Sequence, residues 1–219
     1  GAWAQEPGDA RSLPTVEVQG GSAQAQRRFD AAASSTRVEV DTFTAPTPLV
    51  NLSELLAGQA GVVALDRQNY AQDLQIAVRG FGARSTFGVR GVRILVDGIP
   101  ATMPDGQGQA ATAQLQSAAH VDVLRGPLAQ LYGNAAGGML QVTTREPREG
   151  GGAQASVAAG SYGQRLVDGS IDFGDRTLGG LVVVSRFETD GFRDHSAARR
   201  THLNGKLVAR PDGDTTITT

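Results

Sequence analysis

Four successive segments between residues 152 and 210 alternate small or apolar residues with polar ones. Alternate side chains of an extended strand point to opposite faces, so each segment predicts a strand with one nearly charge-free face. The charge-free faces carry Ala153, Ala155, Val157, Ala159, Val167, Gly169, Ile171, Phe173, Leu181, Val183, Phe187, Leu203, Gly205, Leu207 and Ala209. The polar faces carry Gln154, Ser156, Asp168, Ser170, Asp172, Val184, Arg186, Glu188, His202, Asn204, Lys206 and Arg210. Strands of a transmembrane barrel need this pattern, because one face meets lipid and the other a wet lumen.

The connections between the segments help to separate a barrel from a soluble β-sandwich, which alternates in the same way. "GSYGQ" and "TDGFRDHSAARR" leave one end of the strands, whereas "GDRT" and "PDGD" leave the other. Long connections at one end and tight turns at the other are typical of outer-membrane barrels. An aromatic girdle is expected from residues near the strand ends, namely Tyr162, Phe173, Phe187 and Phe192.

A fifth strand is predicted at "TTITT", the last residues of the sequence. So few strands cannot close a membrane barrel, and an open edge in hydrocarbon leaves backbone groups unpaired at several kcal/mol each. We therefore expect the 219-residue chain to be a fragment.

Composition excludes several classes of function. Cysteine is absent, which removes disulfides, thiolate metal sites and cysteine nucleophiles. The formal net charge of −2 gives no general case for nucleic acid as a partner. The 29 glycines exceed average usage and lack a collagen period, so the backbone must turn or pack closely at many points.

Residues 37–147 mix short strands and short helices, which predicts a small α+β domain. Strands are expected in "RVEVDTF", "LQIAVRG", "VRILVDG", "HVDVLR" and "MLQVTTR". Helices are expected from Asn51 as N-cap to just before Gly58, over "AATAQLQSA", and from Pro127 to Gly133. Residues 1–36 are rich in small and polar residues and predict a flexible arm, with Ala2-Trp3-Ala4 as the remnant of a signal-peptide cleavage site.

Three stretches of residues 50–147 resemble the signatures of the plug of TonB-dependent outer-membrane receptors. They are "IAVRGFG", "ILVDGIP" and "VDVLRGPLAQLYGNAAGGMLQVTT", in the order found in that family. The matching positions are Arg79, Gly80, Asp97, Gly98, Arg125, Gly126, Pro127, Tyr132, Gly133, Gly137 and Gly138. The resemblance implies a plug domain over 37–147, followed over 148–219 by the first four to five antiparallel strands of an incomplete outer-membrane β-barrel. It also implies that Arg79 and Arg125 pair with acidic groups of the wall or plug, for which Asp97 and Asp122 are local candidates.

The resemblance extends to the arm, where "LPTVEVQ", at about residues 13–19, is similar to a TonB box. The matching positions are Thr15, Val16, Glu17 and Val18, with Leu13-Pro14 standing where many members carry an acidic residue. The implied partner is TonB, the periplasmic energy transducer. The implied location is the outer membrane of a Gram-negative bacterium, in contact with its lipid and with the arm in the periplasm. The implied function is import of a scarce large substrate, most often an iron–siderophore complex.

Two loops are expected to face outward and contact the substrate, 82–91 and 101–109. Their candidate contacts are Arg84, Ser85, Phe87, Arg90, Met103, Gln107 and Gln109, which suit an anionic or oxygen-rich chelate.

Other readings of the sequence have less support. "GQGQAA" matches a dinucleotide fingerprint, but Pro100 and Pro104 separate it from the preceding strand. "GNAAGGM" lacks the Lys-Ser/Thr of a phosphate-binding loop, and the three histidines have no metal-ligand spacing. No catalytic constellation is found, so neither an enzyme nor a cofactor is expected. The remaining alternative is a secreted β-rich adhesion or ligand-binding module.

Overall fold

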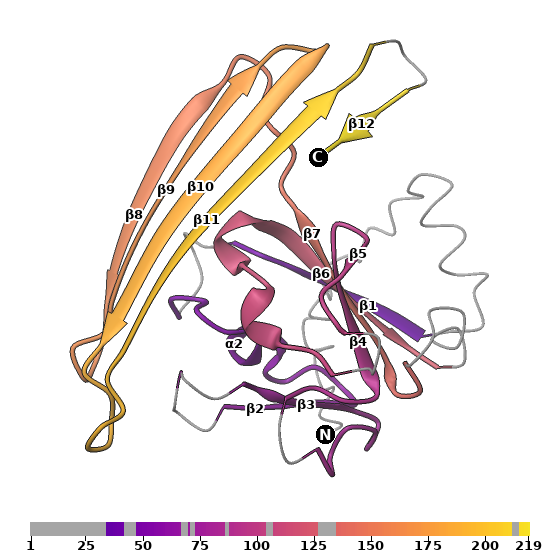
Figure 1. Ribbon diagram of the computed structural model, residues 1–219, viewed down its shortest axis with the longest axis vertical. Coiled ribbons are helices and arrows are strands. Elements are labelled where there is room, and N and C mark those ends of the chain that lie inside the picture. Colours follow the sequence, from indigo (N-terminus) through magenta and orange to yellow (C-terminus); the bar gives the residue numbers. More distant parts are fainter. Residues whose placement is uncertain are drawn as a thin grey trace, which may run out of the picture. The chain divides into compact units, whose positions relative to one another are not determined.

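The computed structural model describes residues 34–41, 47–66, 70, 73–85, 88–103, 107–126, 135–211 and 215–219 (Figure 1). The first of its two five-stranded sheets has the order β1-β6-β7-β4-β5. Its strands are β1 (Ser34–Glu39), β6 (Ala118–Arg125), β7 (Gly138–Thr144), β4 (Val92–Val96) and β5 (Ile99–Pro100). The sheet is mixed, because β4 and β7 are parallel whereas the other neighbours are antiparallel. A separate hairpin pairs β2 (Val62–Leu65) with β3 (Gln75–Val78).

The core of this part lies on the central strands of the first sheet. Val92, Ile94, Val121, Leu140 and Val142 have no exposed surface, and residues of the short helix and of β3 pack against them. Strands buried on both faces read as near-continuous apolar runs, which is why "VRILV" was recognisable as a strand. The other strands predicted for this part are also found, and β1 begins at Ser34, before the predicted start at Arg37.

The first predicted helix is confirmed as α2 (Leu52–Leu56), with Asn51 as its N-cap. The Glu54 carboxylate accepts hydrogen bonds from the backbone N–H groups of Leu49, Val50 and Asn51, at 3.0, 3.0 and 3.1 Å. It thereby satisfies the N–H of the N-cap and fixes the two residues that lead into the helix. Gly58, just past the end of the helix, has a φ of +80°.

The second predicted helix is wrong. Residues 110–118 form two 3₁₀ turns, η1 (Ala110–Thr112) and η2 (Leu115–Ser117), after which Ala118 begins β6. Side-chain hydrogen bonds to the backbone replace helical ones here, since the Gln116 amide donates to the Leu49 carbonyl at 3.1 Å and the Ser117 hydroxyl to the Gln114 carbonyl at 3.1 Å. The third predicted helix, 127–133, lies outside the described residues.

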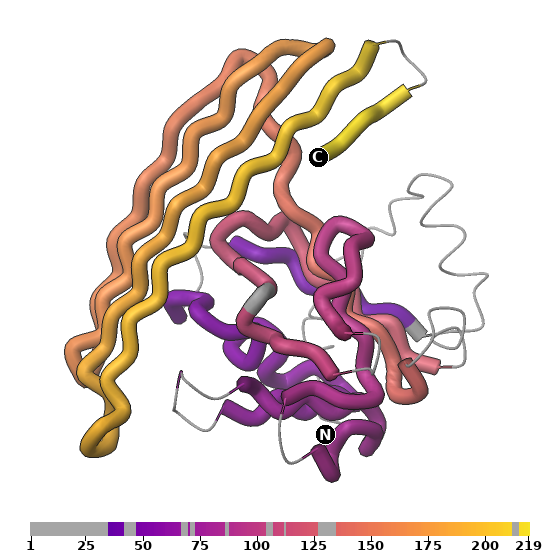
Figure 2. The backbone as a smooth tube through the Cα atoms, viewed as in Figure 1, coloured from indigo at the N-terminus to yellow at the C-terminus, as the bar shows by residue number. Residues whose placement is uncertain are grey.

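The second five-stranded sheet is antiparallel and follows chain order (Figure 2). Its strands are β8 (Gly152–Ala159), β9 (Arg165–Gly174), β10 (Leu178–Thr189), β11 (Ala198–Ala209) and β12 (Ile217–Thr218). Connections 160–164 and 190–197 leave one end, here called the long-connection end, and 175–177 and 210–216 leave the short-turn end. The predicted strands are therefore confirmed, and the connections leave the predicted ends. Their predicted lengths are only partly confirmed, because 190–197 is the longest connection but 210–216 is longer than 160–164.

The predicted charge-free face is the exposed face of this sheet in every long strand except β10. Val157, Ile171 and Leu203 are exposed, whereas Asp172 and Lys206 are buried on the opposite face. In β10, however, the predicted charge-free residues lie on the buried face, because pairing aligns Leu181 with Asp172 and Lys206. Leu181, Val183 and Phe187 are thus 2%, 2% and 3% exposed, and Val182, Val184, Arg186 and Glu188 point outward.

The predicted aromatic girdle is only partly found. Phe187 is not at the outer surface but packs against Tyr70, with ring centroids 4.7 Å apart. Tyr162 and Phe192 are exposed and stack edge to face across the two long connections, with centroids 5.1 Å apart. Among the described residues, no helix has the length and apolarity needed to cross a membrane.

Candidate functional site

Two of the three signature stretches form tight hairpin turns. Arg79 and Gly80 have φ values of 50° and 85° and join Val78 to Phe81, whose backbones exchange two hydrogen bonds of 3.0 Å. Asp97 and Gly98 have φ values of 48° and 83° and join β4 to β5. A two-residue turn with positive φ at both positions matches the twist of paired strands and favours glycine at the second. The charged residue and glycine that end each stretch are therefore explained by turn geometry.

The Asp97 carboxylate fastens its turn to the end of β7. One oxygen accepts the backbone N–H of Thr144 at 2.8 Å, and the other accepts the Thr144 hydroxyl. Asp122 accepts a bidentate pair from Arg37 of β1, at 2.8 and 2.9 Å. Neither aspartate is within ion-pair distance of Arg79 or Arg125 among the described residues, so the two candidate local partners hold strands together instead.

Arg79 and Arg125 lie next to each other beside Gly61. A Cβ atom placed on Gly61 would be 3.7 Å from Cγ of Arg79 and 3.8 Å from Nε of Arg125. Arg125 is 5% exposed, and its Nη1 donates to the Thr36 hydroxyl at 2.7 Å. Its Nε and Nη2 are buried and find no acceptor in the described part of the chain. Burial lowers the pKa of Arg125 below its ordinary value, and the charge of Arg79 lowers it further.

Burying unpaired guanidinium N–H groups is costly unless an acceptor reaches them. Arg125 therefore needs an acceptor for these two N–H groups beyond those that the described residues supply.

The glycines of the third signature allow close backbone approach. A Cβ atom on Gly138, which has a φ of 146°, would lie 2.5 Å from the Leu124 carbonyl oxygen. A Cβ atom on Gly137 would lie 2.5 Å from Cβ of Phe81. Pro127, Tyr132 and Gly133 belong to the segment between β6 and β7. These three residues lie outside the described residues, as does the predicted TonB box.

The two predicted substrate loops, 82–91 and 101–109, are joined to each other. Val89 and Gly108 exchange backbone hydrogen bonds of 3.0 and 2.9 Å, and the N–H of Met103 donates to the Gln107 carbonyl at 2.8 Å. Gly108 fits here because a Cβ atom would lie 2.6 Å from Cγ2 of Thr102. The strands before and after the first loop are not paired with each other, since β3 pairs with β2 and β4 with β7.

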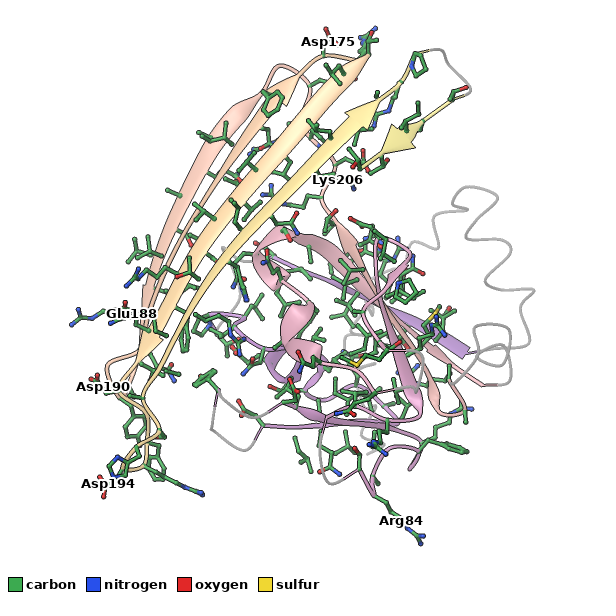
Figure 3. All side chains as sticks on the ribbon, in the orientation of Figure 1. Arg84, Asp175, Glu188, Asp190, Asp194 and Lys206 are labelled. Atoms are coloured by element: carbon green, nitrogen blue, oxygen red, sulfur yellow. The ribbon has the colours of Figure 1, made fainter. Side chains whose placement is uncertain are left out.

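The joined loops expose some of the predicted contacts and bury one of them. Arg84, Arg90, Met103 and Gln109 are exposed, and Figure 3 shows Arg84 projecting away from the ribbon. Gln107 is half-buried. Ser85 is buried and its hydroxyl donates to the Gly88 carbonyl at 2.9 Å, so it shapes the loop rather than facing a ligand. Phe87 lies outside the described residues.

Contacts with β11 give the direction in which these loops point. Arg200, next to the long-connection end, donates to the Asn51 side chain at 3.3 Å and to the Tyr70 carbonyl at 3.2 Å. Lys206, nearer the short-turn end, donates to the Thr144 carbonyl at 3.3 Å. Thr144 ends β7, which runs parallel to β4. Loop 82–91, which precedes β4, and loop 101–109, which is hydrogen-bonded to it, therefore lie at the end of β4 remote from the short turns.

A polar contact region, not predicted from the sequence, links the first part of the fold to the second sheet. Lys206, 6% exposed, also donates to Glu146 at 3.0 Å, and Arg210 donates to the same carboxylate at 2.9 Å. The Gln164 amide donates to the Tyr70 hydroxyl at 3.4 Å. Burial raises the pKa of Tyr70 to about 12, with Glu54 and Asp66 adding to the rise and Arg200 opposing it. The lysine of the alternating segment "HLNGKLVAR" was a sequence signal for this region, whereas nothing in the sequence singled out Tyr70.

The described residues hold no group of three side chains that suits a metal ion.

The family model described as TonB-dependent Receptor Plug Domain matches residues 27–139, just over half of the chain. Among solved structures, the unliganded ferric citrate transporter FecA is similar over 90% of this chain and 32% of its own, with a TM-score of 0.68 and 24% identity. The siderophore receptor PirA from Pseudomonas aeruginosa is similar over 84% of this chain and 34% of its own, with a TM-score of 0.63 and 24% identity.

The ferripyoverdine receptor of the outer membrane of Pseudomonas aeruginosa is similar over 86% of this chain and 24% of its own, with a TM-score of 0.65 and 18% identity. The chain thus spans about a third or less of these solved receptors. The signature turns, the mixed sheet behind them and the antiparallel strands that follow agree with the family match: the chain belongs to the TonB-dependent receptors and comprises a plug domain and the first barrel strands.

Proposed function

We propose that this chain is the N-terminal part of a receptor that imports an iron–siderophore complex across the outer membrane, with energy from the transducer TonB. Support comes from membership of a family of receptors and transporters rather than enzymes, and from neighbours named for siderophores and ferric citrate. In this proposal residues 1–36 form a periplasmic arm, 37–147 the plug and 148–219 the first strands of the barrel.

The observation that carries the substrate class is the pair of joined loops on the plug. They carry two exposed arginines, Arg84 and Arg90, and the exposed Met103. Guanidinium groups form charge-assisted hydrogen bonds with carboxylate and other anionic oxygens, which iron chelates carry. Backbone hydrogen bonds join the two loops to each other, so the proposed ligand meets loops that are already held together.

Replacement of both arginines tests this proposal. In the complete receptor, Arg84→Ala with Arg90→Ala is expected to weaken binding of a ferric siderophore by about 1 to 3 kcal/mol, because each hydrogen bond to a charged ligand contributes on this order. Binding is measured by quenching of intrinsic fluorescence. Arg176→Ala, a comparably exposed arginine in the turn between β9 and β10, is the matched control. Unchanged affinity in the double variant would place the site wholly on the rest of the barrel.

The transducer contact is proposed to be the box at Thr15 to Val18, through addition of an extended strand to a sheet of TonB. Backbone hydrogen bonds supply the affinity in such pairing, and a proline removes one donor and fixes φ. Val16→Pro is therefore expected to abolish uptake while leaving siderophore binding intact, whereas Val16→Ala should retain uptake. Cells that express the proline variant and take up the chelate at the normal rate would reject this box.

A further inference from the structure

The outward face of the second sheet changes from apolar to charged along its strands. From the short-turn end, the rows set by strand pairing present Leu178, then Phe173 and Leu207, then Ile171 and Val182, then Val184 and Leu203. The next row toward the long-connection end carries Arg186 together with the exposed Val157 and Val167, and the row after it carries Arg165, Glu188 and Arg199. We call Arg165, Arg186, Glu188 and Arg199 the arginine row. Figure 3 labels Glu188 on the face opposite to that of Lys206.

The position of the arginine row fits a membrane interface. Leu178 and Glu188 are ten residues apart on one strand, a rise of about 33 Å along the strand. Barrel strands tilt by about 40°, so the two positions are separated by about 25 Å along the membrane normal, the height of the lipid-facing band. If Leu178 lies at one boundary of that band, the arginine row lies at the other, at the level of the lipid headgroups.

The arginine row is preorganised and has donors to spare. Glu188 forms ion pairs with Arg186 at 2.7 Å and with Arg199 at 3.0 Å, and the side chains of both arginines remain largely exposed. Arg165 is exposed and has no ion-pair partner among the described residues. A cavity of about 370 Å³ adjoins Arg165, Glu188 and Arg199, and Asp190 also lines it. Three exposed arginines thus accompany the two carboxylates of Glu188 and Asp190 at this end of the sheet.

At the opposite end of the sheet, the described arginines are paired with carboxylates. Arg176 is 3.5 Å from Glu149, Arg148 is 2.8 Å from Asp172, and Arg210 is 2.9 Å from Glu146. Hydrogen bonds from the backbone N–H groups of Leu178 and Thr177 lower the pKa of Asp175. The two ends therefore differ in charge, as expected if only the leaflet at the long-connection end carries dense phosphate.

We propose that the arginine row binds the phosphate groups of lipids in the leaflet at the long-connection end, an inference that rests on the proposed place of these strands in the outer membrane. Arg165 and Arg199 contact the phosphate oxygens from either side of the cavity. Glu188 acts as a positioning residue that holds Arg199 and Arg186 outward. The alkyl chains of the same lipid lie on the apolar rows below.

Lipid A is the probe for this site, because its diphosphoryl and monophosphoryl forms differ by one phosphate. Native mass spectrometry of the complete receptor in detergent is expected to show preferential retention of the diphosphoryl form. Arg165→Gln with Arg199→Gln should lower that retention by about tenfold, since charge-assisted contacts to phosphate are lost. Arg176→Gln, at the other end of the sheet, should leave it unchanged. Inorganic phosphate should not displace the lipid, because it lacks the apolar contacts.

Three results would overturn the proposal: equal retention of the two lipids by the unaltered receptor, equal loss in the Arg176→Gln control, or displacement by inorganic phosphate alone. Heat-modifiable migration in gels reports separately whether each variant forms a closed barrel. A receptor that shows no such migration contradicts the proposed barrel itself. A closed barrel that does not discriminate between the lipids contradicts only the lipid site.

Discussion

At the scale of single residues, the plug signatures combine turn geometry with one unsatisfied charge. Arg79-Gly80 and Asp97-Gly98 are accounted for by positive φ at both positions of a hairpin turn. Arg125 is different, because two of its N–H groups are buried without an acceptor in the described part of the chain. A charge left in that state destabilises the fold unless a carboxylate arrives from elsewhere.

The effect of Arg125→Met is therefore expected to change sign with context. In the isolated plug, residues 34–147, the unpaired charge is removed and the volume kept, so stability should stay equal or rise by about 1 kcal/mol. In the complete receptor, loss of the partner leaves a carboxylate unpaired and should destabilise by about 3 kcal/mol. Denaturant unfolding of the plug and thermal unfolding of the receptor give the two values. Destabilisation of similar size in both would mean that Arg125 needs no partner beyond Thr36.

At the scale of elements, the longer strands and the helix α2 were predictable from the sequence, whereas the two 3₁₀ turns and the short strands β2 and β5 were not. Strong periodicity and apolar runs located β4, β6, β7 and the long strands of the second sheet. Residues 110–118 have helix-forming composition, but the side-chain hydrogen bonds of Gln116 and Ser117 and the need to enter β6 outweigh propensity. The outward face of β10 was also missed, because Val182, Val183 and Val184 make both faces apolar and only cross-strand register decides.

Only part of the candidate site was predictable from the sequence. The signature positions were found from motifs that are local in sequence, and Arg84 and Arg90 were expected on an outward-facing loop and are exposed. The contacts of Tyr70 and Lys206 with distant partners did not, because they join segments more than sixty residues apart. Such pairs depend on how the plug meets the first strands, which no short motif encodes.

Tyr70 provides a test of that contact at the scale of elements. Tyr70→Ala in the complete receptor should lower stability by about 2 kcal/mol, because half-buried ring surface and the contact with Phe187 are lost. Tyr70→Phe keeps the ring and loses only the 3.4 Å hydrogen bond from Gln164, so its effect should be small. Thermal unfolding measures both. Equal effects of the two substitutions would show that the ring contact contributes nothing.

The same residue predicts a pH dependence. The pKa of Tyr70 is raised from 10.0 to about 12 in the fold, so its contribution is fully present below about pH 10 and declines as pH rises toward 12. The difference in stability between the unaltered receptor and Tyr70→Phe should therefore be constant from pH 7 to about pH 9.5. Above about pH 9.5 the unaltered receptor should lose stability relative to Tyr70→Phe. A difference that does not change up to pH 12 would contradict the burial of this hydroxyl.

At the scale of the whole molecule, the two parts differ in what they need for stability. The plug has a continuous core in which residues such as Leu52, Ile76 and Ile94 are fully buried. The second sheet instead exposes large apolar side chains on its outward face, with Val157 at 77% and Leu203 at 73%. In the described residues its outer strands, β8 and β12, each have a neighbour on one side only. An apolar face and open strand edges are stable against lipid and further strands but not in water.

Residues 148–219 expressed alone are accordingly expected to aggregate in detergent-free buffer, because the exposed face and the unpaired edges associate with other copies. Residues 34–147 should remain monomeric, although more loosely packed. Tyr70 loses its contacts with Phe187 and Gln164, and Arg125 has no acceptor for two of its N–H groups. Size-exclusion chromatography with light scattering after refolding distinguishes the two, and detergent added to 148–219 should shift it from large aggregates toward small mixed micelles. A monomeric, cooperatively unfolding 148–219 in plain buffer would show that these strands form a soluble sheet and would remove the basis for placing them in a membrane.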